Sequence, residues 1–126
     1  MFTDQDPVDT SSVEALIVLE AEGRVGRAMV AMAIQSHLPV VAVSLDPSAL
    51  RLLKFENPQA DLDVLVGSVV DVRSAVWLAD DLRHLKRRYS GVIAPIESPA
   101  LRAEAKPVRG DALDVLRTQI RSASQA

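Results

Sequence analysis

The chain has 126 residues, of which 48% are hydrophobic and 25% are charged, and its formal net charge is −3. This balance predicts a soluble globular domain, and the absence of cysteine excludes disulfides and thiolate metal sites. The chain lacks the basic character of nucleic-acid-binding proteins, and no apolar run approaches the ~18 residues of a membrane span. We therefore expect neither a nucleic acid nor a membrane partner, and a cytoplasmic location.

Residues 1–12 are acidic and lack hydrophobic periodicity, so we predict a flexible N-terminal leader there and a single domain over 13–126. Short continuous apolar runs predict strands that are buried on both faces of a sheet. Four such runs follow one another along the chain, at residues 15–19, 40–44, 62–66 and 91–96.

Segments rich in helix-forming residues separate these strands, and we predict helices over residues 27–36, 48–54 and about 71–89. Strands that alternate with helices in this way indicate βαβ units and a parallel sheet. Residues 97–110 look irregular, and residues 111–124 have the apolar spacing of an amphipathic helix.

Local signals mark some helix ends and faces. Asp46 with the proline that follows it matches an N-cap and first helical position, and Asp71 or Ser74 is expected to cap the third helix. Trp77 is predicted to face inward on that helix, and the basic run at residues 83–88 is interpreted as a solvated helix end.

The segment from residue 15 to residue 96 resembles the N-terminal half of the short-chain dehydrogenase/reductase family. The resemblance rests on the turn and helix start LEAEGRVGRA at 19–28, on the strand and helix at 40–50, and on the segments 66–71 and 89–93. It implies a truncated Rossmann-like parallel sheet of about four strands in the order 3-2-1-4, with flanking helices and a C-terminal amphipathic helix.

The family's glycine turn, T-G-x-x-x-G-x-G, is altered at its first two glycines. They correspond to Glu20 and Arg24, whereas Gly26, which allows close packing of helix on strand, is kept. Gly23 stands one position before the second motif glycine. Glu20 and Glu22 place carboxylates where the family binds phosphate, and we interpret them as satisfying the helix end and occupying the anion site. The alternative is that both are exposed loop residues and that Arg24 binds phosphate.

Other positions that hold the cofactor in the family also differ. Ser44 ends the second strand, where the family often has Asp for the ribose or Arg for a 2′-phosphate. Ser68 stands in place of the adenine-contacting Asp, and Asp71 is interpreted as a cap. We therefore expect no cofactor. The alternative is NAD or NADP held by a set of six candidates, Glu20, Gly23, Arg24, Gly26, Ser44 and Ser68.

The family's proton relay needs a Tyr and a Lys four residues apart on a helix. The only tyrosine is Tyr89, and Ile93 stands four residues further on. The chain also ends before the strand that carries the family's catalytic Ser. His37 and His84 lack the spacing of paired metal ligands. We therefore predict no catalytic residues, no metal site and no enzymatic activity.

The implied strand order places the fourth strand at an edge of the sheet, and an apolar edge favours pairing with another chain. The interface candidates lie on this strand and on the apolar stripe of the last helix, and they are Val92, Ile93, Leu113, Leu116 and Ile120. Alternatively, the apolar stripe of this helix covers the edge of the chain's own sheet. The preferred hypothesis is a non-catalytic short-chain-dehydrogenase-like protein that acts through association, as a homodimer or with a partner, in a scaffolding or regulatory role. The alternative is an NAD(P)- or nucleotide-binding sensor or dehydrogenase subunit that uses the turn at residues 20–26.

Overall fold

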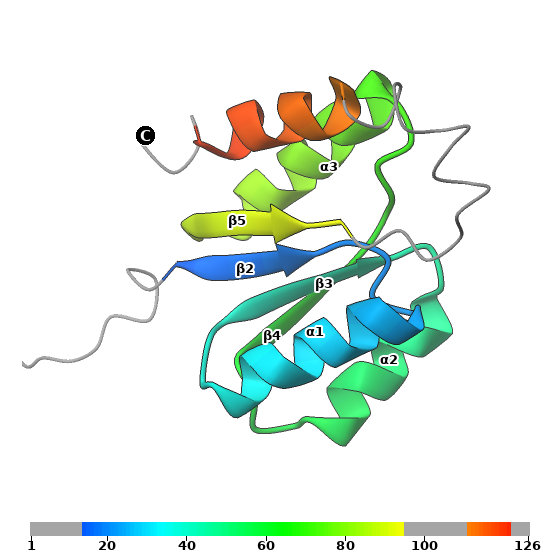
Figure 1. Ribbon diagram of the computed structural model, residues 1–126, viewed down its shortest axis with the longest axis vertical. Coiled ribbons are helices and arrows are strands. Elements are labelled where there is room, and N and C mark those ends of the chain that lie inside the picture. The colour runs from blue at the N-terminus through cyan, green and yellow to red at the C-terminus, as the bar shows by residue number, and fades with distance from the viewer. Residues whose placement is uncertain (1–13, 95–110, 122–126) are drawn as a thin grey trace, which may run out of the picture.

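The computed structural model describes residues 14–94 and 111–121 (Figure 1). Within these residues a sheet of parallel strands has the order β4-β3-β2-β5. The strands are β2 (Ala15–Val18), β3 (Val40–Ser44), β4 (Leu62–Val66) and β5 (Tyr89–Ile93). The helices are α1 (Arg24–Gln35), α2 (Pro47–Glu56), α3 (Val72–His84) and the C-terminal helix, residues 111–121.

This topology confirms the predicted fold, a truncated Rossmann-like sheet with strand order 3-2-1-4 and flanking helices. The first strand along the described chain lies between the second and the last, as the resemblance implies. The predicted leader at 1–12 and the irregular segment at 97–110 lie outside the described residues.

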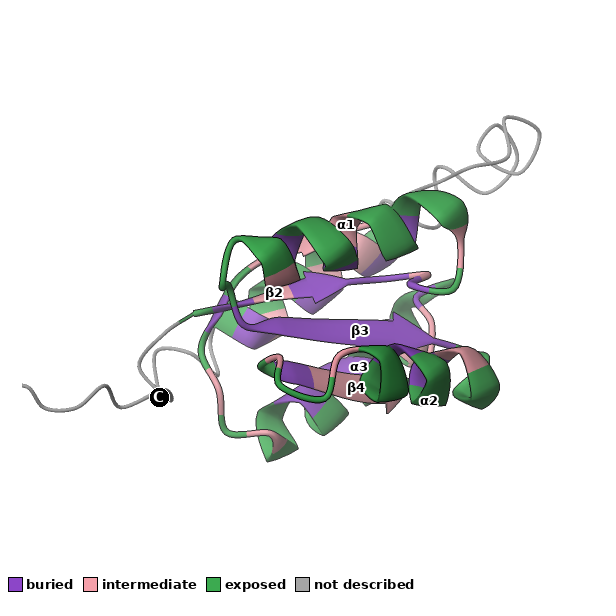
Figure 2. Cartoon of the chain, turned by 90° about the horizontal axis from the view of Figure 1, so that it is seen from below, coloured by how far each residue is buried: buried purple, intermediate pink, exposed green. Residues whose placement is uncertain are grey.

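Helices cover both faces of the sheet and give the domain three layers (Figure 1). On one face, α1 and α2 contribute to a buried cluster that includes Val18 and Val30. On the other face, α3 and the C-terminal helix lie side by side, and their cluster includes Ile17 and Leu116. Strand β3 is buried along its whole length (Figure 2), as a continuous apolar run predicts for a central strand of a parallel sheet.

Two of the helices begin with the aspartate caps that the sequence predicts. The Asp46 carboxylate accepts the backbone N–H groups of Ser48 at 3.0 Å and Ala49 at 3.3 Å at the start of α2. At the start of α3, the Asp71 carboxylate accepts the N–H of Ser74 at 2.8 Å, and the Ser74 hydroxyl accepts the N–H of Asp71 at 3.1 Å. This reciprocal pair is a capping box, in which both candidate residues take part.

Helix α3 is shorter than predicted, and its end corrects the placement of Tyr89. The helix ends at His84, and Lys86 adopts a positive φ of 55° that turns the chain away from the helix. Tyr89 therefore begins strand β5 instead of ending the helix. Helix α1 begins at Arg24, three residues before the predicted start at Arg27, because the helix includes the end of the glycine turn.

The inward face of α3 also differs from the prediction. Trp77 is 64% exposed, whereas Leu78 is only 2% exposed and belongs to the core. The buried positions Ala75, Leu78, Ala79 and Leu82 follow the helical period, and Trp77 falls outside that stripe. The prediction that Trp77 faces inward is therefore wrong.

The apolar stripe of the C-terminal helix packs on this chain's own core. Leu116 is fully buried and Ile120 is 5% exposed, both in the cluster beneath α3, and Leu113 packs against the same cluster. Their assignment as residues that meet another chain is corrected, because these side chains pack against α3 residues and Tyr89 of the same chain. Val92 packs partly against this cluster as well, while Ile93 is half-buried at the end of β5.

Candidate functional site

The carboxyl ends of the parallel strands meet at one edge of the sheet. There β2 leads into α1 on one face, while the helix that follows β5 in the described chain lies on the opposite face (Figure 1). In open α/β sheets, ligands bind in the crevice at such a switch point. The two strands are joined at this end by a hydrogen bond of 2.9 Å from the Leu19 N–H to the Ile93 carbonyl. The turn after β2 is therefore the candidate site.

The turn after β2 is tight and held by backbone hydrogen bonds. Glu20 has a positive φ of 53°, a conformation that favours glycine. The N–H of Ala21 donates to the carbonyl of Val43 at 3.0 Å, which ties the turn to β3. A Cβ atom on Gly26 would overlap the carbonyl oxygen of Glu20 and lie 2.8 Å from the Cα of Ala21. The predicted role of Gly26 in close packing of helix on strand is confirmed.

The start of α1 has a glycine at its N-cap position. This residue, Gly23, has no side chain that could accept a hydrogen bond from the first turn, and the first turn contains no acidic residue. The interpretation that Glu20 and Glu22 satisfy this helix end stays a prediction; Glu20 is half-buried in the turn and Glu22 is exposed. Arg24 is exposed in the first turn. A helix N-terminus presents N–H donors and a partial positive charge.

The two serine candidates differ in what they can contact. Ser44 is 1% exposed, and its Oγ accepts the N–H of Asp46 at 2.9 Å, so this side chain holds the turn before α2. Its assignment as a cofactor contact is corrected by this burial. Ser68 is half-buried and lines a cleft of about 300 Å³ at the carboxyl ends of β3 and β4, beside the exposed side chains of Leu45 and Trp77. The sequence predicts Trp77 in the core and not at this cleft.

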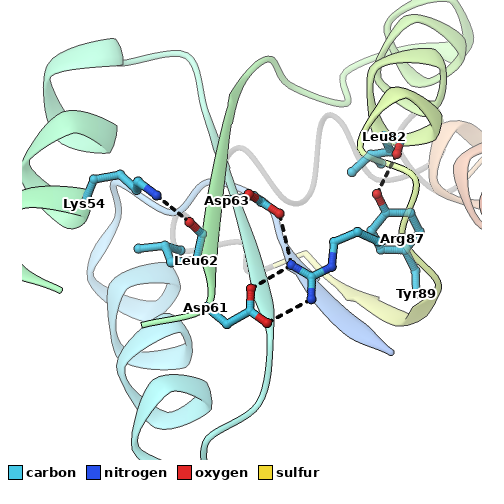
Figure 3. Close-up of polar contacts among 7 residues, drawn as sticks. All are labelled: Lys54, Asp61, Leu62, Asp63, Leu82, Arg87 and Tyr89. Atoms are coloured by element: carbon cyan, nitrogen blue, oxygen red, sulfur yellow. Dashed lines mark hydrogen bonds and ion pairs between the residues drawn. The ribbon is translucent and has the colours of Figure 1, made fainter. Parts of the chain in front are cut away.

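The opposite, amino edge of the sheet carries a polar cluster that ties two distant segments together (Figure 3). Arg87, just before β5, donates to both carboxylate oxygens of Asp61, at 2.7 and 3.0 Å, and to Asp63 at 3.1 Å. The Arg87 side chain is only 11% exposed. Its hydrogen bonds lower the pKa of the Asp61 carboxyl, and the two carboxylates raise the pKa of the guanidinium. The prediction that this basic run is solvated is therefore wrong for Arg87.

The single tyrosine is part of the structure of this edge. The Tyr89 hydroxyl donates to the backbone carbonyl of Leu82 at 2.6 Å, and the residue is 7% exposed (Figure 3). Burial raises the pKa of the phenol to about 12. Tyr89 lies at the end of β5 opposite to the turn at residues 20–26, so its hydroxyl is a structural donor.

Over residues 14–94 and 111–121, no group of three His, Cys, Asp or Glu side chains is placed to hold a metal ion. In the same ranges, no helix has the length and apolar character needed to cross a membrane.

No family model and no curated protein matches this sequence. Solved structures do match. They include YwfH, an NADPH-dependent reductase involved in bacilysin biosynthesis, with a TM-score of 0.70, 16% identity and coverage of 89% of this chain and 53% of that one. A variant of actinorhodin polyketide ketoreductase with NADPH has a TM-score of 0.69, 13% identity and coverages of 89% and 48%. A short-chain dehydrogenase from Streptomyces avermitilis has a TM-score of 0.70 and 15% identity, and the match covers 88% of this chain and 44% of that one.

These similarities correct two predictions. The prediction that the chain is not an enzyme is wrong, because the matching structures are reductases and dehydrogenases and the fold is an enzyme fold. The prediction of no cofactor is wrong as well, since two of these structures, which share this fold, are described with NADPH. This chain spans about half the length of those proteins. It therefore has the fold of the N-terminal half of a short-chain dehydrogenase/reductase.

Proposed function

We propose that this chain binds a nucleotide at the start of α1, as the nucleotide-binding half of an oxidoreductase. One observation carries the proposal: α1 begins at the switch point of the sheet with a glycine N-cap and no acidic residue in its first turn. Helices α2 and α3 begin instead with aspartate caps. Among these three helices, α1 is the one whose N-cap residue supplies no side-chain acceptor. N–H donors at a helix start are what a pyrophosphate requires.

The surrounding residues fit such a ligand. The backbone N–H groups after Gly23 and the guanidinium of Arg24 are the donors that phosphate oxygens need, and the buried Gly26 lets the helix start close to β2. The cleft beside Ser68 and Trp77 has an apolar wall suited to a base. A nicotinamide cofactor would supply hydride chemistry, while this chain would supply binding and orientation.

The carboxylates of the turn set the expected strength of binding. Glu22 is exposed and Glu20 is half-buried, and both lie within the turn that leads into α1. Their negative charge opposes a phosphate, so we expect an affinity weaker than that of a turn with glycine at these places. Replacing Glu22→Gln removes one charge without changing the backbone and is expected to tighten nucleotide binding by about threefold to tenfold.

Thermal unfolding and calorimetry with NADPH, NADP, NAD and ATP test the proposal. A nucleotide present at 100 times its dissociation constant should stabilise the fold by about 2.7 kcal/mol. Arg24→Glu should weaken binding at least tenfold, on the order of 1.4 kcal/mol. Arg51→Glu, on α2 and exposed, is the matched charge reversal and should leave binding unchanged. The absence of any shift with every nucleotide at millimolar concentration, for the wild type and Glu22→Gln alike, would contradict the proposal.

Association with a second polypeptide is a second proposed property, and the outer edge of β5 favours it. In the described part of the sheet, β5 has β2 on one side and no strand on the other. An unpaired edge strand exposes N–H and C=O groups to pairing. Size-exclusion chromatography with light scattering, on the full chain alone and with candidate partners, measures this property directly, and a monomer under every condition would argue against it.

A further inference from the structure

A cavity of about 540 Å³ lies along β5, between this strand and the C-terminal helix. The lining residues come from the segment before β2, from the first part of β5 and from one side of the helix. They include Glu14, Arg88, Gly91, Val92, Arg117 and Arg121. The cavity therefore combines strand backbone with side chains of a neighbouring helix, at the end of β5 opposite to the candidate nucleotide site.

Two features indicate an extended polypeptide as the occupant. β5 is the last strand on its side of the described sheet, so its outer backbone groups have no strand partner there. Gly91 stands in the middle of β5, and a Cβ built on it would meet no atom within 4 Å. A glycine in a strand with open space beside it is a place where another backbone can approach closely.

The charges around the cavity select the chemistry of that segment. Arg117 and Arg121 stand one helical turn apart, and Arg88 reaches the same cavity from the segment before β5. Glu14 is the one acidic residue among the described residues that line it. Arg117 has an acidic neighbour, Asp114, at 3.9 Å, a long and exposed ion pair. Three guanidinium groups against one carboxylate favour a segment that carries carboxylates.

We propose that this β5 site binds an extended acidic segment of a separate polypeptide, whose backbone pairs with β5 and whose carboxylates contact Arg88, Arg117 and Arg121. The proposal rests on the proposed association with a partner and names its surface. A second copy of this chain is a poor occupant, because pairing β5 with β5 would bring two sets of arginines together.

The test uses the full chain and a fluorescent peptide of about eight residues, a common strand length, in which two Asp residues precede alternating Val and Thr. The acidic peptide is expected to bind, and the same peptide with Lys in place of Asp is expected to bind at least tenfold more weakly. Arg88→Glu with Arg121→Glu should weaken the acidic peptide at least tenfold, whereas the exposed Arg51→Glu on α2 should have no effect.

A second variant separates the surface from simple charge attraction. Gly91→Val has open space for its side chain, so it should fold with an unchanged melting temperature and still weaken the acidic peptide at least tenfold by filling the cavity. Equal binding of both peptides, binding that survives Gly91→Val, or no binding of either peptide at millimolar concentration would overturn the proposal. A dimer of the chain that Gly91→Val disrupts would also overturn it, in favour of a second copy. Nucleotide binding is measured separately and is independent of these outcomes.

Discussion

The Nη1 atom of Arg87 lies 2.7 Å from Oδ1 of Asp61. Arg87 precedes β5 and Asp61 precedes β4, and the strands β3 and β2 lie between these two in the sheet. This contact, with the 3.1 Å contact to Asp63, fastens the start of β5 to the start of the edge strand β4. Because Arg87 is nearly buried and its two partners are partly exposed, the pairs should stabilise the fold more than an ordinary surface pair does.

Asp61→Asn is expected to lower the free energy of unfolding at neutral pH by about 1 kcal/mol, since it removes one charged partner of a mostly buried guanidinium. The pKa of Asp61 is lowered in the folded state. Its contribution is therefore complete above the unfolded pKa of about 3.9 and is lost as the pH falls through the folded pKa. Urea unfolding across acid pH should show the wild type and variant converging at the acid end. Asp80→Asn, in an exposed pair at 3.4 Å, is the control and should stay within about 0.5 kcal/mol at all pH values.

Tyr89→Phe removes the hydroxyl that donates to Leu82 and should cost about 1 kcal/mol at neutral pH. The pKa of the phenol is raised from 10.0 to about 12 in the fold. This contribution is therefore present below the unfolded pKa and is lost as the pH rises through the folded one. Tyr89 is the only tyrosine, so its phenolate absorbance reports a single group. A titration midpoint near 10 in the native protein would show that the ring is not buried as described.

Gly26→Ala should destabilise the fold by about 2 kcal/mol or more, because the new methyl group meets backbone atoms of residues 20 and 21 that cannot move independently. Gly91→Ala is the matched control. It has open space around it and should change the free energy of unfolding by less than about 0.5 kcal/mol. Chemical denaturation of both variants measures the difference, and equal effects would be inconsistent with the close approach of α1 to β2.

Lys86→Gly should raise the stability by about 0.5–1 kcal/mol, since glycine adopts the positive φ at this helix end without the steric cost of a side chain. His37, with a φ of 60° after α1, offers the same test at another helix end. Thermal melts of the two glycine variants should move upward together. A downward shift for both would mean that these residues do not end their helices in the left-handed conformation.

Trp77→Gln should change the free energy of unfolding by less than about 0.5 kcal/mol, because the indole is 64% exposed. Its neighbour provides the contrast: Leu78→Ala, at a position 2% exposed, should cost about 2–4 kcal/mol. The fluorescence of Trp77, the single tryptophan, should also be readily quenched by acrylamide in the native state. Strong protection from the quencher would place the ring in the core after all.

The strands, the strand order and the two aspartate caps were predictable because their signals are local or belong to a family pattern. Asp46 and Asp71 stand directly before helix starts, where their side chains need only the next turn of backbone. The close packing at Gly26 was predictable for the same reason, since one glycine of the family's turn is retained at that place.

The features that were missed depend on contacts between distant segments. In the run of basic residues at 86–88, nothing local distinguishes Arg87 from its neighbours, and its partners lie 24 and 26 residues earlier. Trp77 was placed on the wrong face because an apolar side chain beside a buried stripe looks the same in sequence as one within it. The burial of Ser44 and the cleft beside Ser68 likewise follow from how β3 and β4 end next to each other.

Strand β2 is synthesised first among the described strands but lies inside the sheet, with Ala15 in register with Tyr89 on β5. During synthesis, β2 and β3 can pair early, whereas the other side of β2 stays open until β5 leaves the ribosome. Such non-local parallel pairing forms slowly compared with local contacts. Burial of the Tyr89 ring consequently reports the pairing of β5 with β2. The same phenol that stabilises the folded domain can therefore be used to follow the time course of this pairing during folding.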